Sequence, residues 1–430
     1  MAGTIQSVRG FKDILPGEVE KWRFVEEKAR EVLENFGVRE IRVPILEKTE
    51  LFQRGIGEAT DIVEKEMYTF VDKGRESLTL RPEATASVIR AYLQHSLDAR
   101  DPVAKLFTIG PMFRRERPQK GRLRQFHQIN VEFIGVSDAL IDGEIIILLM
   151  HLLKSLGVEG LHLELNSLGC DACRPSFREA IKEFLEGRKE GLCEDCLRRS
   201  EVNPLRVFDC KVEGCREVMA EAPRLPDFLC DDCRSHFETV GECIRMFGIP
   251  FEVRAQMVRG LDYYTRTAFE VTTESEGAQN AVAGGGRYDR LIAELGGPDI
   301  PGVGFAIGME RLVSLVPARA DSFVRHPDLF IAAVGETPRL RAFEICNHLR
   351  LAGIRAEMGY EGKSLKSQMK RSDKLRCSFT LIIGDREVEE KRAYLRDMKK
   401  ATQEAVSLES IDGIAKTISI KIAGRKEEIG

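Results

Sequence analysis

The sequence lacks the features of membrane and exported proteins. None of its apolar runs reaches the length of about 18 residues that a membrane-spanning helix needs. The N-terminus, MAGTIQSVRGFKDILPGE, has no basic stretch followed by an apolar one, so no secretory signal is expected there. These two absences predict a cytoplasmic protein that makes no contact with a membrane.

An overall excess of positive charge is also missing. The chain has 65 Lys and Arg against 69 Asp and Glu, a net charge of −4, which excludes a globally basic nucleic-acid binder. The charge is unevenly spread, however. Residues 325–430 contain 21 basic and 16 acidic residues, a net of +5, which leaves −9 for residues 1–324. A local basic surface in the C-terminal part therefore remains compatible with nucleic-acid binding.

The chain has 430 residues, of which 43% are hydrophobic, enough for two or three domains. A turn-like stretch at 316–322 coincides with the change in charge and predicts a linker. Before it, over 1–324, we expect an α+β domain whose antiparallel sheet has flanking helices. After it, alternating strand and helix patterns predict a small α/β domain over 328–430.

Within the larger domain, the apolar spacing from Lys21 to Phe36 predicts a helix that stops at Gly37. Strand-like runs follow at 40–46, 77–80, 105–113, 125–134, 251–256, 268–273 and 302–307.

Cysteine is the residue in surplus, with 11 in the chain. Eight form four close pairs: Cys170 and Cys173, Cys193 and Cys196, Cys210 and Cys215, and Cys230 and Cys233. Without an export signal, such pairs are more typical of thiolate metal ligands than of disulfides. We expect a Cys-rich helical insertion over 170–240, too small for much core, held by two structural Cys₄ zinc sites. The pairs can be combined in three ways; unliganded thiols or an iron–sulfur cluster are the alternatives.

A second unusual segment is the very basic connection at 114–124, where six of eleven residues are Arg or Lys. On the strand that follows, alternation places one set of side chains on one face: Phe126, Gln128, Asn130 and Glu132. Burying such polar groups without partners costs about 1–3 kcal/mol each. A polar ligand would supply the partners, and the arginines indicate that part of this ligand is phosphate.

Six segments resemble, in the same order, the histidyl-tRNA synthetase family of class II aminoacyl-tRNA synthetases. The basic hairpin MFRRERPQKGRLRQFHQ resembles motif 2, FGVREIRVPILEKTELF resembles motif 1, and GVGFAIGMERL resembles motif 3. TLRPEATA resembles the amino-acid-binding loop, and VRGLDYYTRTAFE and AGGGRYDRL resemble the two signatures peculiar to the family. The cysteine set has no counterpart in the family's common pattern, so the resemblance does not imply zinc.

The resemblance implies ATP-dependent activation of L-histidine to the adenylate and transfer of the histidyl group to the 3′ end of histidine tRNA. ATP would enter with Mg²⁺. The resemblance also implies a homodimer formed through motif 1 and an anticodon-binding role for 328–430. Six basic residues between Lys363 and Arg376 are candidates for phosphate contacts there.

The resemblance also assigns roles to individual residues. Arg114 and Arg259 would be the catalytic groups at the α-phosphate. The ATP-binding set would be Arg114, Glu116, Arg122, Phe126 and Arg311. The histidine-binding set would be Glu83, Thr85, Gln128, Glu132, Tyr263, Tyr264 and Tyr288.

Two other functions compete with the enzyme. One is the regulatory subunit of ATP phosphoribosyltransferase, a paralogue that lacks the C-terminal domain and parts of the histidine signatures. The other is a nucleic-acid-binding sensor that keeps the fold without aminoacylation. The C-terminal domain is present here, and Arg114, Arg259, Tyr264 and Arg311 are all intact, which favours the enzyme.

Overall fold

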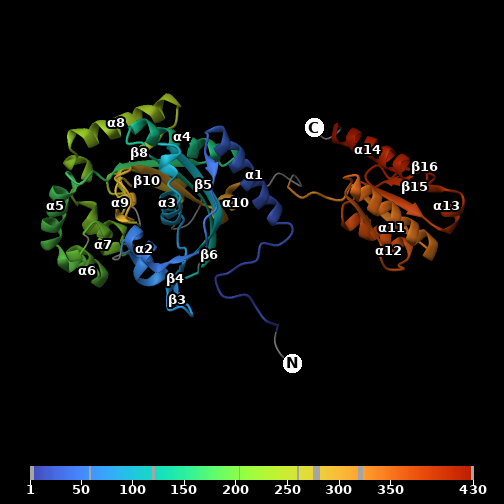
Figure 1. Cartoon of the computed structure of the whole chain (residues 1–430), viewed down its shortest axis with the longest axis horizontal. Coiled ribbons are helices and arrows are strands. Elements are labelled where there is room, and N and C mark those ends of the chain that lie inside the picture. The colour runs from blue at the N-terminus through green and yellow to red at the C-terminus, as the bar shows by residue number, and fades with distance from the viewer. Residues whose placement is uncertain are drawn as a thin grey trace. The chain divides into compact units, whose positions relative to one another are not determined.

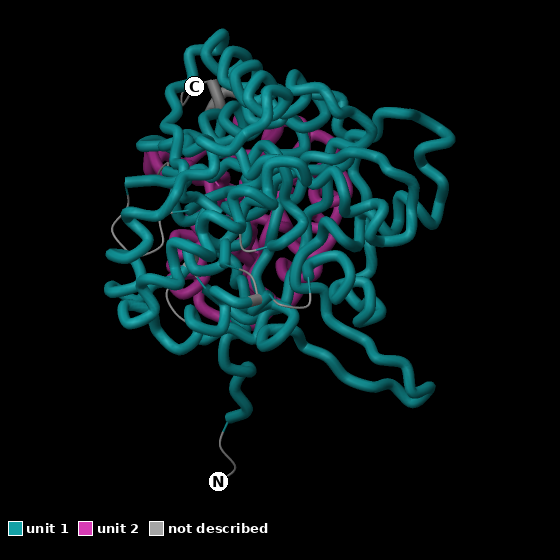
Figure 2. The backbone as a smooth tube through the Cα atoms, turned by 90° about the vertical axis from the view of Figure 1, so that its left-hand side faces the viewer, with its two compact units in different colours: residues 1–319 teal, residues 320–430 magenta. Residues whose placement is uncertain are grey.

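The computed structural model divides the chain into two compact units, residues 1–319 and 320–430 (Figures 1 and 2). The described residues are 4–57, 60–118, 122–202, 204–258, 261–274, 281–317 and 323–427. None of the helices in these ranges is long and apolar enough to cross a membrane.

The first unit is built on an eight-stranded sheet with the order β1-β5-β6-β11-β10-β9-β7-β8. Its strands are β1 (Arg39–Glu40), β5 (Ala104–Phe113), β6 (Gln125–Ile134), β7 (Leu161–Ser167), β8 (Phe251–Val253), β9 (Thr265–Thr273), β10 (Ala281–Arg287) and β11 (Gly302–Gly308). The inner neighbours pair antiparallel, whereas the edge pairs β1–β5 and β7–β8 are parallel. The expected α+β class is confirmed.

The continuous strand expected over 40–46 is wrong. The chain forms the short β1 and then β2 (Leu46–Lys48), and the residues between them are not in a strand. Pro44 lies in this gap and has no backbone N–H to donate to a sheet. The second piece instead joins a small antiparallel sheet, β2-β4-β3, with β3 at Tyr68–Val71 and β4 at Ser77–Leu80.

Helices cover both faces of the large sheet. On one face lie α1 (Val19–Asn35), α4 (Ala139–Ser155) and α10 (Met309–Leu315), which contact one another or strands β6 and β11. The apolar stripe of α1 begins with the buried Trp22 and Val25. On the other side, α3 (Thr85–Gln94) contacts β6 and α2 (Thr49–Ile56), and α2 in turn contacts α9 (Leu291–Glu294). The central strand β6 thus has one face towards α10 and the other towards α3.

The Cys-rich insertion is helical, as expected, and forms the green group in Figure 1. It contains α5 (Arg174–Glu186), α6 (Glu194–Val202), α7 (Glu213–Ala220) and α8 (Asp231–Met246), with 3₁₀ turns at Lys189–Gly191, Pro204–Asp209 and Leu225–Phe228. The expectation of little core is wrong. Phe177, Ile181 and Leu185 of α5 are buried in an apolar cluster that also contains four of the cysteines.

The second unit is a mixed sheet with the order β13-β12-β14-β15-β16. Its elements are β12 (Leu329–Ala333), α11 (Glu336–Leu351), β13 (Ala356–Met358), α12 (Leu365–Lys374), β14 (Phe379–Ile383), α13 (Asp385–Glu389), β15 (Arg392–Asp397), β16 (Gln403–Ser407) and α14 (Ile411–Glu427). Strands β12, β13 and β14 are parallel, and β15 and β16 add antiparallel. This is the small α/β domain that the alternating pattern predicted.

Candidate active site

A cavity of about 190 Å³ opens where β6, β10 and β11 face the start of α3. Fifteen residues line it: Ile62, Glu83, Thr85, Arg114, Gln128, Asn130, Glu132, Leu261, Tyr263, Tyr264, Gly284, Tyr288, Gly304, Phe305 and Ala306. All seven residues expected to bind histidine are among them, together with Arg114. The structure therefore brings together side chains that lie up to about 200 positions apart in the sequence.

Glu132 is one of two buried carboxyl groups among the described residues that line the cavity. One of its oxygens accepts a hydrogen bond from the Thr85 hydroxyl at 2.6 Å, and the other accepts one from the Tyr288 hydroxyl at 2.5 Å. Burial raises the pKa of Glu132 to about 8, against the lowering effect of these two hydrogen bonds. Near neutral pH this group is therefore poised to release a proton when a cationic ligand binds.

The strand-to-strand approach around Glu132 requires a glycine. A Cβ at Gly304 would meet the Glu132 Oε2 atom at 1.9 Å and the Val131 carbonyl oxygen at 2.7 Å. Gly304 and Glu132 are paired neighbours on β11 and β6, so any side chain at Gly304 would displace the carboxylate. The glycine of the GVGFAIG strand is therefore needed for the shape of the cavity.

Acceptor atoms dominate the rest of the polar lining. The Glu83 carboxylate accepts the backbone N–H groups of Thr85 at 2.7 Å and Ala86 at 2.9 Å, at the start of α3, and burial raises its pKa. The Gln128 Oε1 and Asn130 Oδ1 atoms are buried and have no hydrogen-bond partner among the described residues. Two buried carboxyl groups and two unpartnered amide oxygens suit a ligand that carries several N–H donors.

Three tyrosines form an aromatic wall. The ring centroids of Tyr263 and Tyr264 are 4.6 Å apart, and those of Tyr263 and Tyr288 are 5.8 Å apart. Burial raises the pKa values of Tyr263 and Tyr288 well above their ordinary range, so their hydroxyls stay protonated. This wall can contact a planar ring while its hydroxyls act as donors or acceptors.

Arg287, the residue before Tyr288, forms a buried ion pair with Asp142. The Arg287 guanidinium donates from Nε to both Asp142 oxygens at 3.1 Å, and both side chains are completely buried. Burial opposes ionisation of Asp142, but the hydrogen bond from His236 at 2.8 Å and the Arg287 charge hold its pKa below the ordinary value. This network fixes the end of β10 and with it the position of the next residue, Tyr288.

The basic hairpin carries a second group of expected site residues. Arg114 lines the cavity, donates from Nε to the Pro82 carbonyl at 2.8 Å, and holds its guanidinium 5.3 Å from the centre of the Phe126 ring. Glu116 accepts a hydrogen bond from Arg122 at 2.7 Å. The basic and aromatic side chains of motif 2 are thus adjacent to the mouth of the polar cavity.

Two of the expected site residues, Arg311 and Arg259, are not among the described residues that line the cavity. Arg311 lies on α10 and does not line the cavity, and burial lowers its pKa. Arg259 lies outside the described residues. Asn130 is a lining residue that the sequence-based assignment omitted, although its place beside Gln128 and Glu132 on one strand face was the signal for it.

The eight clustered cysteines form two groups of four. One group is Cys170, Cys173, Cys230 and Cys233, and the other is Cys193, Cys196, Cys210 and Cys215. Within each group the four Sγ atoms lie within 4.8 Å of one another. Of the three possible combinations of pairs, the structure selects the one in which the first and last pairs meet.

Comparison with known proteins gives a consistent result for both units. The family model described as "Histidyl-tRNA synthetase" matches residues 10–312, and the model described as "Anticodon binding domain" matches residues 328–417. The histidine–tRNA ligase of Desulfosudis oleivorans is 56% identical over 95% of this chain and 97% of its own length. That of Geobacter metallireducens is 55% identical over 94% and 98%. The crystal structure of apo histidyl-tRNA synthetase from S. aureus is 36% identical, with a TM-score of 0.81, over 96% of this chain and 100% of that one.

Proposed function

The chain belongs to the histidyl-tRNA synthetase family, and we propose which of its residues bind the substrates and which catalyse the formation of histidyl-adenylate. It activates histidine with ATP, in the presence of Mg²⁺, and charges histidine tRNA. Its match to an anticodon-binding model also separates it from the shorter regulatory paralogue considered above.

We propose that the acceptor-lined cavity binds histidine. Glu83, Thr85 and Gln128 surround the α-ammonium group, which carries three donors, and Gln128 Oε1 is one of the unpartnered oxygens. Glu132 and Tyr264 contact the imidazole nitrogens, and Tyr263 and Tyr288 complete the pocket. An apolar side chain of similar size would leave the Glu132 carboxyl group without its donor, which gives selectivity against it.

Activation requires alignment of the histidine carboxylate with the α-phosphorus and neutralisation of the charge that gathers there. We assign this task to Arg114, which lines the cavity, and to Arg259. Phe126 and Glu116 contact the adenine, and Arg122 and Arg311 contact the outer phosphates. A guanidinium suits each phosphate contact because it stays protonated and donates two parallel hydrogen bonds. Mg²⁺ binds mostly to the phosphates of ATP and to water.

The single observation that carries this proposal is the contact of Arg114 with both the histidine cavity and the Phe126 ring. The test is histidine-dependent ATP–pyrophosphate exchange by Arg114→Lys. We expect the exchange rate to fall by about 100-fold or more, since lysine keeps the positive charge but cannot donate two parallel hydrogen bonds to the phosphate. The exposed neighbour Arg115 provides the matched control, and Arg115→Lys should stay within about twofold of the parent. Equal rates in the two variants would contradict the assignment.

We propose a homodimer formed through motif 1. Apolar side chains are exposed in motif 1, just before β2, and on β3 of the same small sheet: Ile45 is 42% exposed, Phe70 46% and Val71 67%. A second copy that covers them would remove this apolar surface from water. The double variant Phe70→Asp, Val71→Asp should sediment as a monomer, while Leu351→Asp, at an exposed position of the second unit, should not change the mass. A monomeric parent protein would contradict the proposal.

Two further assignments concern the other parts of the chain. We propose that α12 of the second unit contacts tRNA phosphates through exposed basic side chains, which include Lys366 and Lys370. We also propose that the insertion carries structural zinc on its clustered cysteines. We also propose that the protein acts in the cytoplasm, as translation enzymes of this family normally do.

A further inference from the structure

The two cysteine clusters are nested in the sequence. The pairs that open and close the insertion, at 170–173 and 230–233, meet in the outer cluster. The pairs between them, at 193–196 and 210–215, meet in the inner cluster. The inner cluster therefore closes a small loop inside the larger loop that the outer cluster closes.

The sulfur spacing in both clusters fits one tetrahedral ion. Zinc binds thiolates at about 2.3 Å, so four sulfurs around one ion lie about 3.8 Å apart. The Sγ atoms of Cys170 lie 3.7 Å from Cys173 and 3.8 Å from Cys230 in the outer cluster. In the inner cluster, Cys193 and Cys210 are 3.8 Å apart. A disulfide needs about 2.0 Å, and a multi-iron cluster would separate the sulfurs further.

The local backbone supports thiolates in both clusters. Cys173, Cys196 and Cys233 lie at or near the first turns of α5, α6 and α8. Each cluster also has one backbone N–H of a cysteine that donates to the sulfur of another. Cys230 donates to Cys173 Sγ, and Cys193 donates to Cys215 Sγ, both at 3.1 Å. Such hydrogen bonds stabilise and orient the metal-binding form of a thiol.

Arginines close to these cysteines in the sequence contact residues 261–264 of the first histidine signature, which form the histidine-binding loop. Arg174, which follows Cys173, donates to the Tyr264 carbonyl and, at 3.3 Å, to the Leu168 carbonyl. Arg206, four residues before Cys210, donates to Asp262 at 3.0 Å from Nε and at 2.8 Å from Nη2. Asp262 and Tyr264 flank Tyr263 in the first histidine signature, so one arginine from beside each cluster holds this loop.

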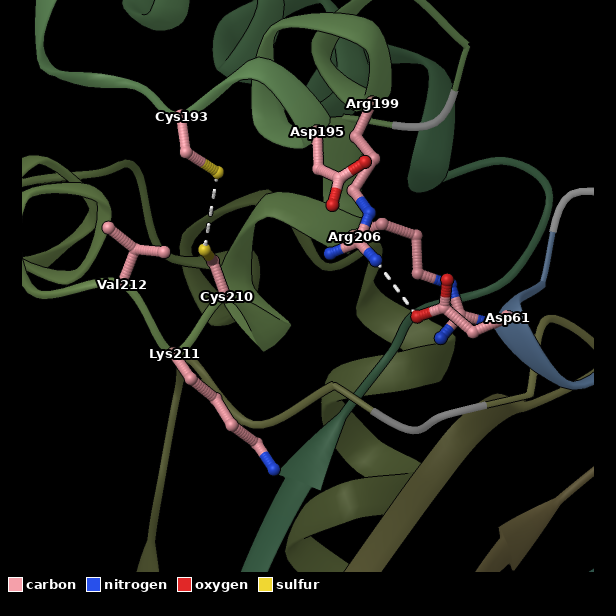
Figure 3. A pocket seen from close by; sticks show the side chains of 8 residues that line it. All are labelled: Asp61, Cys193, Asp195, Arg199, Arg206, Cys210, Lys211 and Val212. Atoms are coloured by element: carbon pink, nitrogen blue, oxygen red, sulfur yellow. Dashed lines mark hydrogen bonds and ion pairs between the residues drawn. The ribbon is translucent and has the colours of Figure 1, made fainter. Parts of the chain in front are cut away.

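A further contact comes from beside the inner cluster. Arg199, three residues after Cys196, donates to Asp61 at 2.9 Å. Figure 3 shows this pair together with Cys193 and Cys210, whose sulfurs are joined by a dashed line; all four residues line a cavity of about 290 Å³. Asp61 precedes Ile62, which lines the histidine cavity. The inner cluster is thus connected to the active site from two sides.

We propose that each cluster binds one Zn²⁺ and that the two ions position Arg174 and Arg206, which hold the histidine-binding loop. This inference rests on the proposed zinc content of the insertion and on the proposed histidine site. It assigns the insertion a part in histidine binding beyond its own stability. Arg174 and Arg206 act as positioning residues, because both contact the loop and neither is among the residues that line the histidine cavity.

Metal analysis of double variants tests the ligand sets. The parent chain should contain close to two zinc ions, one for each cluster. Cys173→Ser, Cys233→Ser removes two ligands of the same site and should leave one ion. Cys173→Ser, Cys196→Ser and Cys173→Ser, Cys215→Ser each damage both sites and should leave almost none. Cys243→Ser, outside both clusters, is the control and should keep both ions.

Each alternative has its own pattern. If consecutive pairs shared a site, the variant at 173 and 196 would keep one ion. If alternate pairs shared a site, the variant at 173 and 215 would keep one ion. Either result would overturn the nested ligand sets while leaving the zinc proposal intact. Well under one zinc per chain in the parent, or iron in place of zinc, would overturn both the nested ligand sets and the zinc proposal. Native mass spectrometry gives these counts without any measurement of activity.

The positioning role has a separate test on the intact two-zinc protein. Arg206→Gln should raise the KM for histidine by about tenfold in the exchange assay, while the KM for ATP stays within about twofold. Arg206→Lys should recover part of the loss. Arg188→Gln is the matched control, because Arg188 makes its ion pair with Glu221 inside the insertion. An unchanged KM for histidine in a two-zinc Arg206→Gln protein would overturn the positioning role alone.

Discussion

The Tyr288 hydroxyl donates a 2.5 Å hydrogen bond to the Glu132 carboxyl group inside the cavity that we propose binds histidine. The two residues are 156 positions apart: Glu132 lies in β6, and Tyr288 directly follows β10. Tyr288 is 1% exposed and Glu132 is also 1% exposed, so this contact is shielded from water. Once the carboxyl group is ionised, a hydrogen bond to it in such a place contributes about 1.5–3 kcal/mol.

Removal of that hydroxyl should weaken histidine binding. Tyr288→Phe leaves one Glu132 oxygen without its donor, so the carboxylate becomes harder to form. We expect the dissociation constant for histidine to rise by about tenfold, measured by isothermal titration. Tyr92→Phe changes a buried tyrosine of α3 outside the cavity and should leave the constant within about twofold. Equal constants in both variants would contradict a role for the Tyr288–Glu132 contact.

Histidine binding should release a proton near neutral pH. The pKa of Glu132 is raised to about 8, so the carboxyl group is mostly protonated at pH 7.5 in the unliganded protein. A ligand with cationic and N–H groups favours the carboxylate, so affinity should increase as pH rises from about 7 to 8. Titrations at pH 7.5 in two buffers of different ionisation enthalpy measure the proton count. We expect most of one proton in the parent and almost none in Glu132→Gln; equal release would exclude Glu132 as the source.

The basic helix of the second unit should contribute to tRNA binding through charge. Neutralisation of Lys366 and Lys370 together, by substitution with alanine, should weaken binding and flatten the log–log salt dependence by about two. Histidine-dependent exchange should not change, because neither residue lies in the active site. Lys391→Ala, Lys399→Ala removes two exposed charges elsewhere in the same unit and provides the control. An unchanged salt slope in the first variant would rule out the α12 contact.

The buried pair Asp142–Arg287 should be important for folding of the first unit. Asp142→Asn leaves Arg287 buried with less compensation and should lower the free energy of unfolding by about 3 kcal/mol. The measurement is urea unfolding followed by Trp22 fluorescence, since Trp22 is the one tryptophan of the chain. Asp98→Asn, at an exposed position, should unfold as the parent does. Because the pKa of Asp142 is lowered, its stabilising effect should be present at neutral pH and decrease as pH falls.

The strand that carries the site was predictable because its alternation is regular. Period-two spacing put Gln128 and Glu132 on one face of β6, and the structure confirms that both line one cavity. Strand β10 was not predicted because Gly284, Gly285 and Gly286 have low strand propensity by themselves. A Cβ at Gly285 would meet the Gly304 carbonyl oxygen at 2.1 Å, so close packing requires glycine there.

The pairing of the cysteines depends on tertiary packing and could not be predicted. The four pairs can be combined in three ways, and their spacing does not choose among them. In the structure, the segments that lead into α5 and α8 meet and bring Cys170 to Cys230. The contacts of Arg174 and Arg206 with the histidine-binding loop could not be predicted from the sequence either. Both arginines lie in helical segments where a charged residue is ordinary.

Glu132 is the acceptor that we propose recognises histidine. The decisive measurement is isothermal titration of L-histidine into the parent chain and into Glu132→Gln, with Glu252→Gln on the exposed edge strand β8 as the control. We expect Glu132→Gln to weaken histidine binding by about 100-fold, while the control matches the parent. Parent-like affinity in a folded Glu132→Gln protein would contradict this role of Glu132.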